Sequence, residues 1–184
     1  MAKKVLVFFA DGCEEVEALA PVDMLRRAGA DVTVVGVRAK TQVSSHGISV
    51  NTDVALSELG TEKDFDMIVL PGGIPGTNYL DASKEVDAYV SRAVKEGKFI
   101  GAICAAPSIV LGSRNILDKK KATCYPGMEP GMKGHIPTDK KVVVDGNIIT
   151  ASGVGVSVEF SLALVGALYG KKVQDDLAKK VVSK

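Results

Sequence analysis

Cys104 stands at the junction between an apolar run and a run of small residues, which is an unusual place for a thiol. The run from Phe99 to Ile103 predicts a buried strand, and Ala105 and Ala106 follow where the chain must turn into a helix. A nucleophile elbow has this form, because tight sterics require small neighbours around a nucleophile at a strand end. We expect the positive end of the helix dipole to favour the thiolate and to lower the thiol pKa. A free cysteine is usually a small buried hydrophobe, but this position favours a functional thiol.

Glu17 is the acid that we expect to lie closest to this thiol. With Glu14 and Glu15 it opens a predicted helix, and acids at a helix start are usually solvated groups that complement the dipole. That interpretation fits Glu14 and Glu15. Glu17 lies three residues after Glu14, on the same side of the helix and close to the strand ends. In a pocket of low dielectric its carboxyl would hold a proton at neutral pH, donate it to the thiolate in a hydrogen bond and serve as a proton shuttle.

Pro71, Gly72 and Gly73 end another predicted strand. The glycines permit a turn whose backbone N–H groups point at an oxygen that develops negative charge. Alone, the motif indicates an ordinary tight turn. Its expected position beside Cys104 favours an oxyanion site.

Motifs for other chemistry are missing from the sequence. The two histidines, His46 and His135, lie neither beside Cys104 nor at a predicted strand end, which disfavours a cysteine–histidine hydrolase. The three cysteines have no metal-ligand spacing, and no nucleotide-binding glycine motif occurs. We therefore expect no metal, no organic cofactor and no disulfide scaffold. Cys13 and Cys124 are interpreted as structural residues, with a role as resolving thiols as the alternative.

Composition limits the class of protein. A chain of 184 residues with 46% hydrophobic residues is expected to form one domain, residues 1–184. With 23 basic and 22 acidic residues, its formal charge of +1 gives no field to hold nucleic acid or an anionic membrane. The apolar runs are too short for a signal-peptide core or a bilayer span, so we expect a cytoplasmic protein without a membrane segment.

The expected elements alternate between strands and helices. Strands are predicted over 5–9, 31–37, 67–70 and 99–103, and helices over 14–28 and 86–95. This alternation predicts a parallel sheet covered by helices, with its ligand crevice at the carboxyl ends of the strands. Later we expect a strand around 122–124, a loop over 126–137, a hairpin of 142–144 with 148–150, and a helix over 156–169, whereas 42–51 forms a short hairpin or an excursion.

Several blocks together resemble the ThiJ/PfpI superfamily, and specifically its DJ-1 branch. In chain order they are DGCEEVEA (11–18), PVD (21–23), RRAG (26–29), VLPGG (69–73), AICAAP (102–107) and GVGVSVEF (153–160). The resemblance spans nearly the whole chain. It implies an α/β fold, a flavodoxin-like three-layer sandwich with a mostly parallel central sheet and a nucleophile elbow, and it implies a homodimer.

The resemblance also implies roles for particular residues. Cys104 matches the oxidisable nucleophile and Glu17 the acid hydrogen-bonded to it, whereas the backbone of Gly72, Gly73 and Ala105 matches the lining of the oxyanion pocket. Protease-like relatives place histidine directly after the nucleophile, where this chain has alanine, so peptidase activity is not expected.

Three further residues match positions near the pocket. Tyr125 stands where one relative has histidine, so a histidine-assisted step does not carry over. Arg27 and His46 fall near positions that approach the pocket across the dimer in relatives. These residues are therefore expected to contribute to the pocket or to the partner's pocket.

The implied activity is a glutathione-independent glyoxalase, or a protein deglycase, that acts on methylglyoxal, glyoxal or their early adducts through a Cys104 hemithioacetal. The alternative is an oxidative-stress sensor or redox-regulated chaperone in which Cys104 is oxidised to a sulfinic acid held by Glu17. A third possibility is a non-catalytic dimeric scaffold, in which nothing would depend on Cys104.

Overall fold

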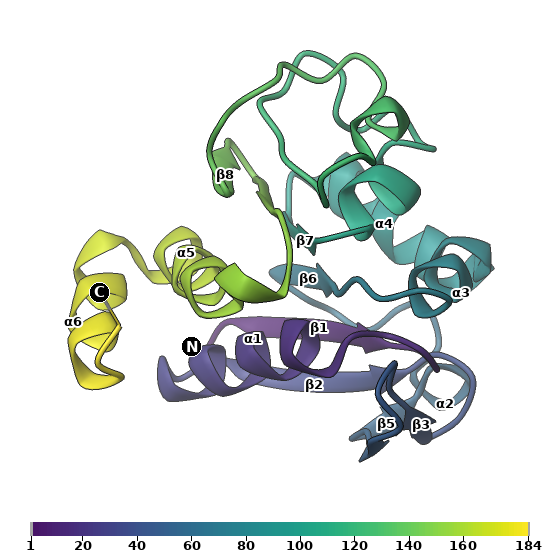
Figure 1. Ribbon diagram of the computed structural model, residues 1–184. Helices are drawn as coiled ribbons and strands as arrows, with labels where there is room; N and C mark the ends of the chain where they lie inside the picture. The colour runs from purple at the N-terminus through teal and green to yellow at the C-terminus, as the bar shows by residue number, and fades with distance from the viewer. Residues whose placement is uncertain (1, 184) are drawn as a thin grey trace.

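A seven-stranded sheet lies at the centre of the computed structural model, which describes residues 2–183, and helices cover both of its faces (Figure 1). The strand order is β5-β2-β1-β6-β7-β9-β8. Every neighbouring pair is parallel except β8 and β9. The sheet confirms the expected flavodoxin-like α/β sandwich. Its strands are β1 (Lys4–Phe9), β2 (Asp31–Gly36), β5 (Val54–Ala55), β6 (Met67–Leu70), β7 (Phe99–Ile103), β8 (Val142–Asp145) and β9 (Ile148–Ala151).

The central strands are apolar along their whole length because both faces of the sheet are covered. In β1 every residue after Lys4 is buried, and all four residues of β6 are buried. Val5 of β1 lies opposite Val32 on one side and Met67 on the other. A parallel sheet between two helical layers requires such continuous hydrophobic runs rather than alternation.

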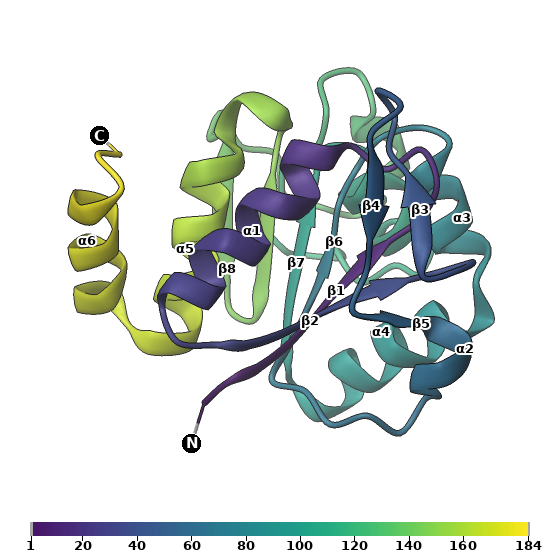
Figure 2. The same cartoon turned by 90° about the horizontal axis from the view of Figure 1, so that it is seen from below.

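The helices form two layers and one outlying element. α1 (Glu15–Arg27) and α5 (Ser157–Tyr169) lie side by side on one face, and α3 (Gly76–Ala82) and α4 (Lys84–Glu96) cover the other (Figures 1 and 2). The short α2 (Leu56–Leu59) follows β5, and α6 (Lys171–Lys180) packs on the outer side of α5. No helix within residues 2–183 combines the length and apolarity that a bilayer crossing needs.

Both hairpins suggested by the sequence are present. β3 (Thr41–Val43) and β4 (Ser49–Asn51) pair in a separate antiparallel sheet, which confirms the hairpin within 42–51. β8 and β9 pair about the turn at 145–147, also as predicted.

The predicted strand around 122–124 is wrong. Only an isolated bridge joins Lys121 to Ile136, and the Thr123 N–H donates to the side-chain hydroxyl of Thr150 instead of to a strand backbone. This segment has the β propensity of a strand, but the position beside β9 is occupied by β8, and the segment joins no ladder of the sheet.

The helix expected after Cys104 is present, but it is short. Ala105 and Ala106 lead into a single π-helical turn, Pro107–Leu111, rather than into a long helix. A turn of this length carries little of the dipole that a full helix would present to the thiol.

Candidate active site

Three neighbouring parallel strands, β1, β6 and β7, bring three sequence motifs to one edge of the sheet. Gly72 shows how closely they meet: a Cβ placed on it would lie 2.5 Å from the Cβ of Cys104 and 2.6 Å from Glu17 Oε2. Only glycine leaves room for the thiol and the carboxyl to approach each other there. The expected convergence of the Asp11–Glu17, Pro71–Gly73 and Cys104–Ala106 segments is therefore present.

Cys104 occupies a strained elbow directly after β7. Its φ of 62° is in the left-handed region, which a residue with a side chain adopts at a cost of about 1 kcal/mol or more. Backbone hydrogen bonds hold it from two sides: its N–H donates to Ala151 O at 2.8 Å, and its carbonyl accepts from the Tyr125 N–H at 2.8 Å. The side chain is only partly buried, so the thiol remains accessible.

Glu17 reaches this thiol from the first turn of α1. Its residue is 1% exposed, and its Oε2 accepts a hydrogen bond from the Gly72 N–H at 3.0 Å. Burial raises the pKa of the Glu17 carboxyl to about 7; hydrogen bonds from Cys104, Gly72 and Val154 lower it, and the charge of Glu14 raises it. The carboxyl therefore exchanges its proton near neutral pH.

The thiol does not have the lowered pKa that the sequence suggested. Burial raises the pKa of Cys104 to about 12, and the negative charge and hydrogen bond of Glu17 add to the rise. The N–H groups of Gly73 and Ala105 act in the opposite direction, but they do not outweigh burial. The expectation of a thiolate stabilised by a helix dipole is wrong, because the following turn is short and the neighbouring carboxylate repels a second negative charge.

The N–H groups near the sulfur come from two turns. Those of Gly73 and Ala105 face Cys104, whereas the Gly72 N–H is used by Glu17. Gly73 has a φ of +86°, and a Cβ on it would lie 2.4 Å from Glu14 N. Two backbone donors thus converge on the place where a reacting group on sulfur would develop charge.

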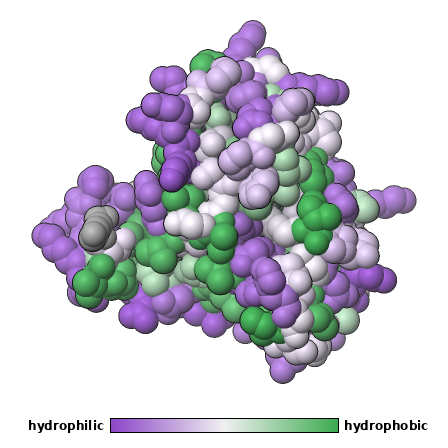
Figure 3. All heavy atoms as spheres, in the orientation of Figure 1, coloured by the Kyte–Doolittle hydropathy of each residue, from purple (hydrophilic) through white to green (hydrophobic). Residues whose placement is uncertain are grey.

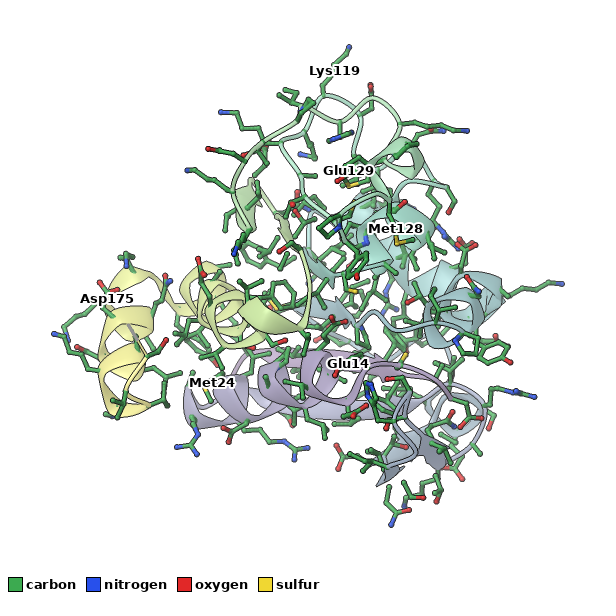
Figure 4. The ribbon with its side chains drawn as sticks, viewed as in Figure 1. Glu14, Met24, Lys119, Met128, Glu129 and Asp175 are labelled. Carbon is green, nitrogen blue, oxygen red and sulfur yellow. The ribbon has the colours of Figure 1, made fainter. Side chains whose placement is uncertain are left out.

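The remaining expected residues are spread over the molecule. Tyr125 lies at the site: its ring carbon Cδ2 is 3.7 Å from where a Cβ on Gly153 would be, and that position is 3.9 Å from Glu17 Oε1. Arg27 instead pairs with Asp23 at 2.9 Å. It lies beyond Met24 at the end of α1 opposite Glu14, so within one chain it does not reach the thiol (Figure 4).

His46 lies at the tip of the β3–β4 hairpin. Its Nδ1 is 2.8 Å from Glu15 Oε1, and this pair ties the hairpin to the start of α1. Glu14, Glu15 and His46 offer three possible metal-ligand atoms within 4.8 Å of one another. Each acid already has a protein partner, because the Glu14 carboxylate accepts from the Glu17 N–H at 2.6 Å.

The sequence reasoning gave the segment after β9 no role in the site. The Val154 N–H donates to Glu17, and residues 152–156 form one wall of a hollow beside the site. β9 is also a parallel neighbour of β7, so the rule that points to strand ends would have singled out the run SGVG at 152–155.

Known proteins are similar to this chain in sequence and in fold. The sequence model of the DJ-1/PfpI family matches residues 3–167. Protein DJ-1 homolog A of Arabidopsis thaliana is 40% identical over 179 residues, which are 96% of this chain but 45% of that protein. This chain thus spans under half the length of that plant relative.

Two further relatives match along nearly their whole length. Glutathione-independent glyoxalase DJR-1.2 of Caenorhabditis elegans is 32% identical over 92% of this chain and 90% of its own. The structure of oxidized Toxoplasma gondii DJ-1 superposes with a TM-score of 0.95 at 34% identity, covering 99% of both chains. Since the family match runs through the elbow and both glycine turns, the chain belongs to the DJ-1/PfpI family.

Proposed function

We propose that the chain is a cysteine-dependent, glutathione-independent glyoxalase that also removes early aldehyde adducts from proteins. The observation that carries the proposal is the accessible Cys104 thiol, hydrogen-bonded to a carboxyl whose pKa is about 7, with two backbone N–H groups facing the sulfur. A relative of 32% identity bears the name of a glutathione-independent glyoxalase, which supports the same reaction class.

The first step joins the sulfur to the aldehyde carbon of methylglyoxal. The Glu17 carboxylate accepts the thiol proton as the S–C bond forms, and the carbonyl electron pair moves onto oxygen. The N–H groups of Gly73 and Ala105 stabilise this oxyanion. Proton transfer from Glu17 to the oxyanion gives a neutral hemithioacetal. Because Glu17 takes the proton during attack, the reaction does not need a free thiolate beforehand.

The second stage moves a proton between the two carbons. Glu17 removes the hydrogen of the former aldehyde carbon to give an enediolate. Glu17 then returns this proton to the former ketone carbon, the hydroxyl proton of the former aldehyde carbon moves to the neighbouring oxygen, and the product is a lactoyl thioester of Cys104. Water then cleaves the S–C bond, releases lactate and restores the thiol. The sum is methylglyoxal plus water to lactate plus a proton. A carboxyl with a pKa of about 7 suits this alternation of base and acid at neutral pH.

Removal of an early adduct would use the same first step, the attack of the Cys104 sulfur on the aldehyde carbon. An early adduct of methylglyoxal with an amine or thiol is a hemiaminal or hemithioacetal, and it releases the aldehyde to the Cys104 sulfur. Small reactive aldehydes and their adducts are therefore the proposed substrates.

We also propose that two chains associate through the face formed by α1 and the start of α5. Its exposed hydrophobic side chains include Val16 at 47%, Leu19 at 38% and Val158 at 40% of full exposure. Figure 3 shows hydrophobic residues gathered over this part of the molecule. Burial of such a face would stabilise a dimer. Arg27 and His46 would reach the partner's site only in that assembly.

The alternative function is a thiol sensor or redox-regulated chaperone. Cys104 is the partly exposed thiol, whereas Cys13 and Cys124 are buried, so peroxide would reach Cys104 first. The Glu17 carboxyl would hold a sulfinic acid formed there. Mass spectrometry after mild peroxide would support this role by two added oxygen atoms on Cys104 alone, and oxidation of all three cysteines at equal rates would contradict it.

The deciding experiment for the glyoxalase measures lactate formed from methylglyoxal without glutathione. The wild type should form lactate, and the Cys104→Ala variant should not. Cys124→Ala serves as the matched control and should retain activity, because its thiol is buried and donates to the Tyr125 carbonyl at 3.3 Å. Equal rates for the wild type and Cys104→Ala would overturn the proposal.

A further inference from the structure

A hollow of about 300 Å³ adjoins the site, between the Tyr125–Pro126 turn and residues 152–156. At about 30 Å³ per liquid water it has room for about ten waters. Its two polar residues are Lys141 and Ser152. The rest of its side-chain lining is apolar and comes from Tyr125, Pro126, Val154 and Val156.

Two of these apolar side chains are exposed in the single chain, next to the reacting groups. Tyr125 is 52% and Val154 is 50% exposed. Backbone hydrogen bonds fix both to the site, because the Tyr125 N–H donates to the Cys104 carbonyl at 2.8 Å and the Val154 N–H donates to Glu17. A concave apolar surface beside a reactive group is the usual form of a site for a small molecule.

Gly153 connects the hollow to the carboxyl of Glu17. A Cβ built on this glycine would lie 3.7 Å from the ring carbon Cδ2 of Tyr125 and 3.9 Å from Glu17 Oε1. The ring and the carboxyl therefore lie within contact distance of one point, and Gly153 places no side chain there. A molecule that touches the carboxyl can extend from it to the ring.

The proposed reaction determines which part of the substrate lies there. Glu17 exchanges protons with both carbons of the 2-oxoaldehyde, so both carbons must lie within reach of its carboxyl. The N–H groups of Gly73 and Ala105 face the sulfur and hold the oxyanion. The substituent is attached to the former ketone carbon, so it begins beside Glu17. The hollow that continues from Glu17 past Gly153 is therefore the space available to this substituent.

We propose that this hollow binds the apolar end of the substrate, so that the chain prefers 2-oxoaldehydes with a branched alkyl or aryl substituent over methylglyoxal. The inference rests on the proposed glyoxalase function and names its substrate class. A methyl substituent would leave most of the hollow to water. Tyr125 is then a specificity-determining residue, because its aromatic ring offers the largest apolar surface in the lining.

Two further variants serve as controls for Tyr125→Ser, which removes the ring. Tyr125→Phe keeps the ring and removes only the hydroxyl, so it separates apolar contact from hydrogen bonding. Tyr79 is a matched tyrosine elsewhere on the surface: it is 37% exposed and lines a different hollow, of about 420 Å³, beside Arg38. Tyr79→Ser therefore removes the same side chain without touching the hollow beside Glu17.

The first experiment compares kcat/KM for methylglyoxal, 5-methyl-2-oxohexanal and 4,5-dioxovalerate. The last two have substituents of similar length that end in an isopropyl group and in a carboxylate. In the wild type, kcat/KM for 5-methyl-2-oxohexanal should exceed both other values by about three- to tenfold, because an apolar hollow rewards added apolar groups. Equal or higher values for 4,5-dioxovalerate would overturn the inference.

The variants then test the role of the ring. Tyr125→Ser should lower the preference for 5-methyl-2-oxohexanal over methylglyoxal by about three- to tenfold, mainly through KM. Tyr125→Phe and Tyr79→Ser should keep this preference within about twofold of the wild type. A preference that Tyr125→Ser leaves unchanged, or that Tyr125→Phe lowers as much as Tyr125→Ser, would overturn the inference.

A second readout does not depend on turnover. Iodoacetamide and iodoacetanilide carry the same reactive group, and the second adds a phenyl ring, so their relative rates of Cys104 alkylation report apolar contact beside the sulfur. Mass spectrometry should show that Tyr125→Ser lowers the ratio of iodoacetanilide to iodoacetamide about two- to fivefold relative to Tyr79→Ser. If 2-hydroxy acids form but the ratio does not depend on Tyr125, the inference fails and the glyoxalase stands. If the ratio depends on Tyr125 but no 2-hydroxy acid forms, the glyoxalase proposal fails and the apolar site stands.

Discussion

Two turns at the same edge of the sheet each carry a thiol, and they differ in what surrounds it. Cys13 follows β1 and Cys104 follows β7, and burial raises the pKa of each thiol to about 12. Cys13 is fully buried, and its sulfur accepts the Ala10 N–H at 3.4 Å. Cys104 is partly exposed and lies in hydrogen bond with Glu17. Access and a proton acceptor, rather than intrinsic acidity, separate the candidate nucleophile from the structural thiol.

The largest expected effect comes from exchanging the thiols for alanine. Cys104→Ala should lose methylglyoxal turnover by about 10³-fold or more, because the covalent intermediate has no sulfur to form on. Cys13→Ala should keep most of its activity and lose stability, since it leaves a small cavity in the core. Lactate assays and thermal melts of both variants test this difference between the two thiols. A Cys13→Ala variant as inactive as Cys104→Ala would contradict it.

Glu17→Gln tests the proton acceptor. We expect kcat to fall about 10²- to 10⁴-fold, because general acid–base catalysis is lost while the Gly72 N–H still finds an oxygen. In the wild type, kcat/KM should rise with pH through about 7 as the pair of Glu17 and Cys104 loses its first proton. A wild-type profile that is flat between pH 6 and 8 would contradict the assignment of Glu17.

The same substitution should also change stability with pH. The folded-state pKa of Glu17, about 7, lies above its ordinary value of 4.5. The neutral carboxyl therefore contributes fully to the stability of the fold below about pH 4.5, and this contribution is lost as pH rises through 7. Glutamine stays neutral throughout. From pH 5 to pH 8 the stability of Glu17→Gln relative to the wild type should therefore rise by about 1–3 kcal/mol, as measured by urea unfolding. An unchanged difference would mean that the buried carboxyl carries no shifted pKa.

Gly72→Ala probes the closeness of the two groups. The added methyl would lie 2.5 Å from the Cys104 Cβ and 2.6 Å from Glu17 Oε2, so one of them must move, at a cost of about 1–3 kcal/mol. Turnover should fall together with stability because the thiol and carboxyl separate. Gly155→Ala is the stability control, since nothing lies within 4 Å of its added methyl. Equal melting temperatures for the two variants would show that the space left by Gly72 is not needed for the close approach of Cys104 and Glu17.

The contrast between the turns also shows what sequence patterns reveal. The apolar runs of β1, β6 and β7 predicted the sheet, and a parallel sheet places its strand ends together, so the meeting of Glu17, Gly72 and Cys104 followed from pattern and topology. The thiol pKa did not follow, because it depends on burial and on a carboxylate that approaches from α1. The sequence reasoning missed α6, although Val173 and Leu177 recur at helical spacing and pack against the core.

The smallest effect separates backbone strain from chemistry at the two turns. Cys104 has a φ of 62°, so Cys104→Gly should be more stable than Cys104→Ala by about 1 kcal/mol, because glycine adopts this conformation without strain. Cys13 is not among the residues with positive φ, so Cys13→Gly should be less stable than Cys13→Ala by about 0.5–1 kcal/mol through its more flexible unfolded chain. Chemical denaturation of the four variants measures both differences. Opposite signs would show that, of these two turns, only the one that carries Cys104 has a strained backbone, and like signs would show that strain does not distinguish them.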